Sequence, residues 1–182
     1  MLFGSRPMNR RLPDFKLSLL GKELMPSESI KSLGVTFDPT LSFNKHMSST
    51  VSSFMSKLAQ ISRAKHALNS DLLVIIINAL VFSKLYYCSS VWSNTSASNM
   101  QKVKLVQNFA ARIIRGATKF EHITPSLKNL GWLPVKMALP WLRRVAERII
   151  RANEKGIHSN FFTNCKCLIY SMSTGMLSRA SL

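Results

Sequence analysis

The spacing of apolar residues changes near position 43 of the 182-residue chain. Before that point, short apolar runs alternate with turn-forming residues such as Gly21, Pro26 and Pro39, which is typical of strands and turns. From Phe43 onward, apolar residues recur at steps of three, four or seven, so they align on one side of a long helix that should end near Asn69. The pattern predicts two or three strands followed by helices.

Three further long helices are predicted after the first. One is capped by Ser70 and runs towards Val91, and because it is apolar nearly all round we expect it at the centre of the fold. The next has an apolar stripe and ends at Gly116, a residue type that commonly terminates helices. The last covers about 134–155, and Pro140 should kink it or delay its start.

These elements predict a mainly α fold, with short N-terminal strands followed by a bundle of about four to five helices. We divide the chain into strands over 1–40, a helical domain over 41–156 and a loosely ordered tail over 157–182. The tail is set apart because apolar periodicity is lost there and serine becomes frequent.

The charge balance points to a polyanionic partner. The chain has 25 Lys and Arg against 8 Asp and Glu, a formal net charge of +17, and such an excess is typical of proteins that bind nucleic acid. The N-terminus lacks the apolar core of a signal peptide, so we expect an intracellular protein that is not secreted. The most apolar stretch, 72–82, is shorter than the roughly 20 residues needed to cross a bilayer.

No cluster of residues in the sequence indicates catalysis. Metal-dependent nucleotidyl transfer needs clustered carboxylates, because two divalent ions about 4 Å apart share acidic ligands. The eight acidic residues here are dispersed. Cys165 and Cys167 with His158 are too few and too closely spaced for a typical zinc site. We therefore assign no catalytic residue, no metal ligand and no cofactor to this chain.

Two predicted helices carry basic faces with few acids nearby. A charge stripe usually marks a solvated helix face, but two such faces with so little compensation favour contacts to phosphates. The tryptophans Trp92, Trp132 and Trp141 lie at element ends or in apolar runs, so we expect them to pack in the core. The candidate nucleic-acid-binding residues are Lys104, Arg112, Arg115, Lys119, Arg144, Arg148 and Arg151.

Five motifs follow one another over about residues 2–156. They are Leu2–Ser5; Ile30–Asp38 with Leu41–Phe43 and His46; Tyr86–Trp92 in the pattern Y-x-x-x-x-V-W; Val106–Ile114; and Thr124-Pro125 followed by Leu130–Val135. In this order and spacing they resemble the reverse transcriptase of non-LTR retrotransposons, of LINE-like, Jockey or CR1 type. The resemblance covers the part of that enzyme that follows its catalytic aspartates.

The resemblance implies that 1–40 correspond to the last strands of the polymerase palm, with Leu33, Gly34 and Val35 near the hairpin that holds the primer end. The helices from Phe43 onward then resemble the thumb, which grips the RNA and DNA of the template–primer duplex beside the upstream palm and fingers. The paired aspartates that bind Mg²⁺ in the family are missing. We therefore expect Mg²⁺ only in the full-length polymerase and no activity from this chain alone.

The leading hypothesis is a fragment of an RNA-directed DNA polymerase of a retrotransposon, acting in the nucleus or cytoplasm, that retains template–primer-binding helices. The alternative is a non-catalytic basic helical nucleic-acid-binding module derived from the element. A third interpretation places the basic faces on anionic lipid; it ranks last because the apolar and basic residues fall on different helices. A detached fragment that aggregates through exposed strand edges also remains open.

Overall fold

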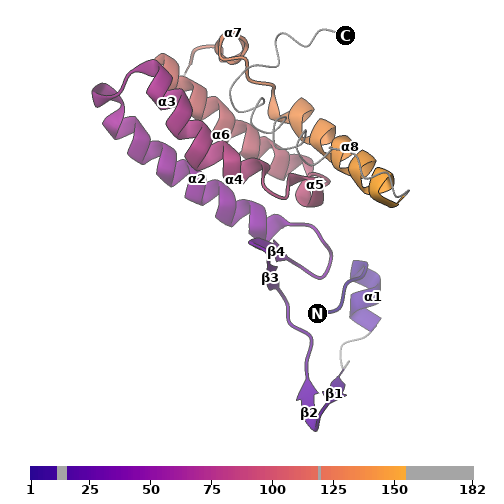
Figure 1. The fold of residues 1–182 in the computed structure, drawn as a ribbon. Coiled ribbons are helices and arrows are strands. Elements are labelled where there is room, and N and C mark those ends of the chain that lie inside the picture. The colour runs from indigo at the N-terminus through magenta and orange to yellow at the C-terminus, as the bar shows by residue number, and fades with distance from the viewer. Residues whose placement is uncertain (12–15, 119, 155–182) are drawn as a thin grey trace. The chain divides into compact units, whose positions relative to one another are not determined.

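The computed structural model describes residues 1–11, 16–118 and 120–154 (Figure 1). They divide into two compact units, with the boundary between Ser49 and Thr50. Short strands precede a series of helices, so the predicted fold class is confirmed. Predictions that fall outside the described residues are those for Lys119, for His158, Cys165 and Cys167, and for the tail over 157–182.

The first unit contains one short helix and two β-hairpins. Strands β1 and β2 pair antiparallel, as do β3 and β4. The hairpins were expected, but the helix was not: Pro7, in its first turn, has a fixed φ that suits helix entry and was read as a loop signal. The elements are α1 (Arg6–Arg11), β1 (Leu17–Leu19), β2 (Lys22–Leu24), β3 (Ile30–Ser32) and β4 (Val35–Phe37).

The β3–β4 hairpin turns on two residues with left-handed backbones. Leu33 has a φ of 46° and Gly34 a φ of 81°, the geometry of the two-residue turns that match strand twist. Beyond the turn, the Phe37 ring contacts the Phe43 ring edge-on, with 5.8 Å between centroids. The backbone N–H of Thr36 donates to Nδ1 of His46 at 3.4 Å. The hairpin is thereby tied to the chain that follows it.

Asp38 organises the backbone before α2 (Asn44–Ala64). Its carboxylate accepts hydrogen bonds of 2.8 Å from the backbone N–H groups of Ser42 and Phe43, and a third from the N–H of Thr40. Partial burial alone would raise the pKa of Asp38, but the hydrogen bonds from Ser42, Thr40 and Phe43 outweigh it and hold the pKa below its usual value. The charged carboxylate therefore fixes this turn.

The second unit is helical. After most of α2, its elements are η1 (Lys65–Ala67), α3 (Ser70–Ile77), the π-helical η2 (Asn78–Phe82), α4 (Ser83–Tyr86), α5 (Ser89–Trp92), α6 (Ala97–Arg115), α7 (Thr124–Asn129) and α8 (Val135–Glu154). None of the described helices is both long and apolar enough to cross a membrane.

The single helix predicted from Ser70 to Val91 is wrong in two respects. A π-helical segment interrupts it, and Cys88, with a φ of 50°, breaks it before α5. Its cap is Asn69, whose side chain accepts from the Leu72 N–H at 2.8 Å. Neither a π-segment nor a left-handed cysteine leaves a mark in the spacing of apolar residues.

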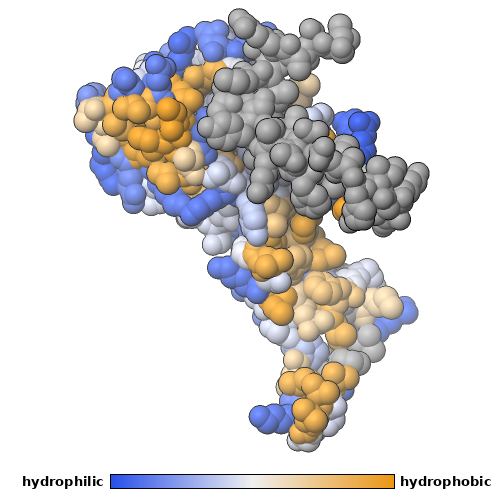
Figure 2. Space-filling model, viewed as in Figure 1, coloured by the Kyte–Doolittle hydropathy of each residue, from blue (hydrophilic) through white to orange (hydrophobic). Residues whose placement is uncertain are grey.

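The same helix is also less central than predicted. Neighbouring helices bury one side of it, including Leu73 and Ile77, but the other side faces outward. Figure 2 shows apolar surface gathered over α3. Leu72, Ile75 and Leu80 are 45%, 61% and 47% exposed. Its apolar residues exceed what its neighbours in the described part of the chain cover.

Helix α6 forms the core of the second unit. It contacts α3, α7 and α8, and the predicted apolar stripe of Val103, Val106 and Ala110 is fully buried. Burial of Trp92 and Trp132 confirms the core role expected of them. Helix α8 already begins at Val135, ahead of its internal proline, so the proline does not delay its start.

Candidate nucleic-acid interface

The basic face of α6 is built by a well-delimited helix. Ser96 caps its start by accepting from the Asn99 N–H at 3.3 Å, and Gly116 ends it in a left-handed conformation with a φ of 66°. Lys104 and Arg115 are exposed, and Arg112 is half-buried. None of the three has an ion-pair partner among the described residues. Their charge is available to an external anion.

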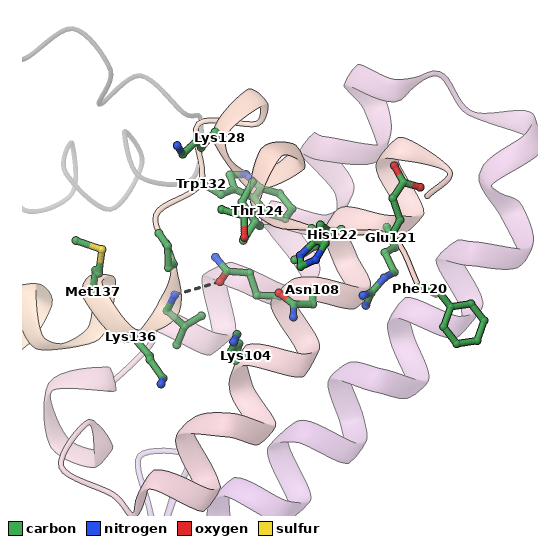
Figure 3. Close-up of a pocket in the computed structure, with 16 residues that line it drawn as sticks. Lys104, Asn108, Phe120, Glu121, His122, Thr124, Lys128, Trp132, Lys136 and Met137 are labelled. Carbon is green, nitrogen blue, oxygen red and sulfur yellow. Dashed lines mark hydrogen bonds between the residues drawn. The ribbon is translucent and has the colours of Figure 1, made fainter. Parts of the chain in front are cut away.

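Beside this face lies a cavity of about 640 Å³ (Figure 3). Its walls come from α6, the loop before α7, α7 itself and the start of α8. Four cationic side chains line it, against one acid, Glu121. They are Lys104, Arg112, Lys128 and Lys136. Sequence analysis proposed the first two but missed Lys128 and Lys136, because no helical spacing links them to α6.

A buried glutamine brings these elements together. The Gln107 amide nitrogen donates to the Leu133 carbonyl oxygen at 2.8 Å, and its amide oxygen accepts from the Val135 N–H at 3.1 Å. The side chain is 1% exposed, so both bonds form away from water. They attach the start of α8 to the middle of α6 and place Lys136 on the same cavity as Lys104 (Figure 3).

The loop between α6 and α7 orients Arg112. Its Nε donates to the Thr118 carbonyl oxygen at 3.3 Å, while the Thr118 N–H donates to the Glu121 carboxylate at 3.3 Å. The plane of the guanidinium is thus set by the backbone. Its two terminal nitrogens have no partner within the described chain and can donate to a bound oxyanion.

The basic residues of α8 form a separate group. Arg144, Arg148 and Arg151 are exposed, and none of them lines the cavity. The nearby acid Glu147 pairs instead with Nε of Arg143 at 3.5 Å. The structure therefore leaves the three predicted arginines uncompensated, on a surface apart from the α6 pocket.

A further basic pair was missed by sequence reasoning. Lys57 of α2 and Lys84 of α4 lie close enough that, after partial burial, the charge of Lys84 and a hydrogen bond to it lower the pKa of Lys57. Lys57 also lies 5.9 Å from the centre of the Phe54 ring. Like charges held together in this way are relieved by an anion. Their distance in sequence gave no signal.

The candidate primer-grip residues belong to the first unit. Leu33 is 82% exposed at the tip of the β3–β4 hairpin, and Gly34 is exposed beside it. Val35 is 3% exposed and packs inward. Contact with a primer through this hairpin is thus sterically open to Leu33 and Gly34.

The acidic and metal-ligating side chains of the described residues do not come together. No group of three or more His, Cys, Asp or Glu that could hold a metal ion occurs there. Two-metal chemistry needs shared carboxylates, so these residues do not fit the Mg²⁺ site of a polymerase. No step below is routed through a metal.

The chain is similar to the RNA-directed DNA polymerases from the mobile element jockey of Drosophila melanogaster and Drosophila funebris. Each is 27% identical over 104 residues, which is 56% of this chain and 11% of the polymerase. The chain is related over about half its length to retrotransposon reverse transcriptases. It spans only a small part of the relatives it matches. No protein-family model and no solved structure matches it.

Proposed function

We propose that this chain is a nucleic-acid-binding fragment of a retrotransposon RNA-directed DNA polymerase, which grips the template–primer duplex through the basic faces of α6 and α8 and does not polymerise by itself. The observation that carries the proposal is the set of uncompensated cations on two helices. The relationship to the jockey polymerases supports nucleic acid as the partner.

The spacing of the cations suits a phosphate backbone. From Lys104 to Arg115 the helix rises about 16 Å, a length comparable to roughly five phosphates at about 3.4 Å per strand position. Lysine and arginine contacts of this kind position a duplex without reading its bases. Grip without sequence preference is the property a polymerase needs as it moves along its template.

In the proposed role, the β3–β4 hairpin adds a contact near the primer end. Leu33 is the exposed residue at its tip, and Gly34 allows the backbone to turn there. Val35 supports the hairpin from within. The alternative is a non-catalytic binding module derived from the element, which would use the same faces of α6 and α8 on its own.

Binding of a labelled RNA–DNA duplex, followed by fluorescence anisotropy, tests the proposal. Reversal of two α6 charges, Arg112→Glu with Arg115→Glu, should weaken binding about a hundredfold or more, since each lost phosphate contact also lowers the salt dependence by about 0.9. The matched control is Lys22→Glu, an exposed lysine of β2. Equal affinity of the double variant and the wild type would contradict the proposal.

Extension of a primer by the purified chain with Mg²⁺ would contradict the second half of the proposal, the absence of polymerase activity. The assay uses the same duplex with a recessed primer end and all four deoxynucleotides. A polymerase of known activity, added to a parallel reaction, shows that the duplex can be extended. The result expected is binding without extension.

A further inference from the structure

Phe120 is the most exposed aromatic residue in the second unit. Its side chain is 93% exposed, in the loop between α6 and α7. An apolar ring in this position contributes almost nothing to folding, because it buries no surface. It nevertheless belongs to the lining of the cationic cavity, together with Arg112. An exposed ring beside unpaired cations indicates a binding surface.

The rest of the cavity has the character of a site for a flat, anionic ligand. Its deeper wall is apolar and firmly packed, with Ile123, Leu127 and Trp132 all buried. Trp132 is held by an edge-on contact to Phe82, with 4.6 Å between ring centroids. At about 640 Å³, the cavity lies within the range of small-molecule sites, about 300–1,000 Å³. One nucleotide fits in such a volume.

The polar groups are distributed along the cavity. In Figure 3, Phe120 lies at one end and Lys136 at the other, with Asn108 and His122 between them. The Asn108 side-chain oxygen is shielded from solvent and has no hydrogen-bond partner in the described chain. If the amide turns toward the cavity, a base amino group is the partner it lacks.

We propose that this pocket binds an unpaired nucleotide of single-stranded RNA or DNA. The base stacks on Phe120 and enters the cavity, and Lys104, Arg112, Lys128 and Lys136 hold the flanking phosphates. A duplex cannot use Phe120 in this way, because its base faces are already stacked on one another. This inference rests on the proposed nucleic-acid-binding function and adds a preference for unpaired strands at one site.

The test compares a single-stranded 12-nucleotide RNA with the duplex that it forms with complementary DNA, by fluorescence anisotropy on the full chain. Phe120→Ala should weaken binding of the single strand about tenfold, a loss in the range of one base–aromatic stacking contact. Binding of the duplex should change less than twofold. Phe120→Trp should restore the single-strand affinity, because it keeps an aromatic face.

Two controls separate stacking from general effects. Tyr87→Ala removes another exposed aromatic of the second unit that does not line the cavity, and it should change neither affinity. Lys136→Ala should lower the salt dependence of single-strand binding by about 0.7, the value for one phosphate contact. Since Phe120 is so exposed, the melting temperature of Phe120→Ala should equal that of the wild type.

The outcomes distinguish this inference from the function on which it rests. If Phe120→Ala binds the single strand as tightly as the wild type, or loses affinity equally for strand and duplex, the nucleotide pocket is wrong while duplex binding stands. If the wild type binds neither strand nor duplex, both proposals are wrong.

Discussion

The hairpins and helix α6 are stabilised in different ways. Every residue of β1, β2 and β3 is exposed, whereas α6 buries eight of its 19 residues. The hairpin unit relies on local polar contacts, above all those of Asp38 and His46. The helical unit relies on buried apolar surface, which leaves its outer faces to be shaped by charge. Changes to the core and to polar groups should therefore affect the two units differently.

Leu139→Ala should have the largest effect. Leu139 is fully buried on α8, and the substitution of alanine for a buried leucine lowers the free energy of unfolding by about 2–5 kcal/mol. Chemical denaturation monitored by circular dichroism measures it. The control is Met137→Ala, on the same helix but 62% exposed. Equal stability of the two variants would show that α8 is not packed as described.

Gln107→Ala should come next, at about 2–4 kcal/mol, because it leaves the Leu133 carbonyl and the Val135 N–H without their buried partner. The matched control is Gln101→Ala, an exposed glutamine of the same helix. Denaturation measures the stability. Gln107→Ala should also weaken nucleic-acid binding, since it releases the start of α8 from the pocket. A variant as stable as the control would remove Gln107 from its organising role.

Asp38→Asn should destabilise the hairpin unit by about 1–3 kcal/mol, through weaker hydrogen bonds to Ser42 and Phe43. Because the folded pKa of Asp38 is lowered, its contribution is complete above about pH 4 and is lost as the pH falls through the folded pKa. Hydrogen exchange of the Ser42 and Phe43 amides follows this loss. Asp71→Asn, at an exposed residue of α3, should leave both amides protected.

The smallest effect is expected at His46. Burial, and then the charge of Lys31, lower the pKa of His46, which must be neutral at Nδ1 to accept from the Thr36 N–H. Its stabilisation is therefore present above about pH 6.5 and declines as the pH falls below that value, by about 0.5–1 kcal/mol. The protection factor of the Thr36 amide measures it. In His46→Gln this pH dependence should vanish; its persistence would assign it to another group.

The sequence predicts best what local chemistry decides. The cap at Ser96, the end at Gly116 and the apolar stripe between them predicted α6 closely, because all three signals lie within one element. The break at Cys88 was not predictable, since a left-handed residue of this type is selected by tertiary packing and not by its own preference.

The pocket depends on contacts between distant residues. Lys128 and Lys136 join the α6 face only because Gln107 holds the start of α8. Phe120 appeared in the sequence as one apolar residue in a loop, and nothing there distinguished exposure from burial. Charge and periodicity thus identified the α6 and α8 faces, while the shape of the site required the fold.

The most direct test of the central claim is the dependence of RNA–DNA duplex affinity on salt. Six phosphate contacts, from Lys104, Arg112, Arg115, Arg144, Arg148 and Arg151, predict that the logarithm of the association constant falls with the logarithm of salt concentration at a slope of about −5. Fluorescence anisotropy at several salt concentrations measures it. A slope near zero, or no binding at low salt, would contradict the account.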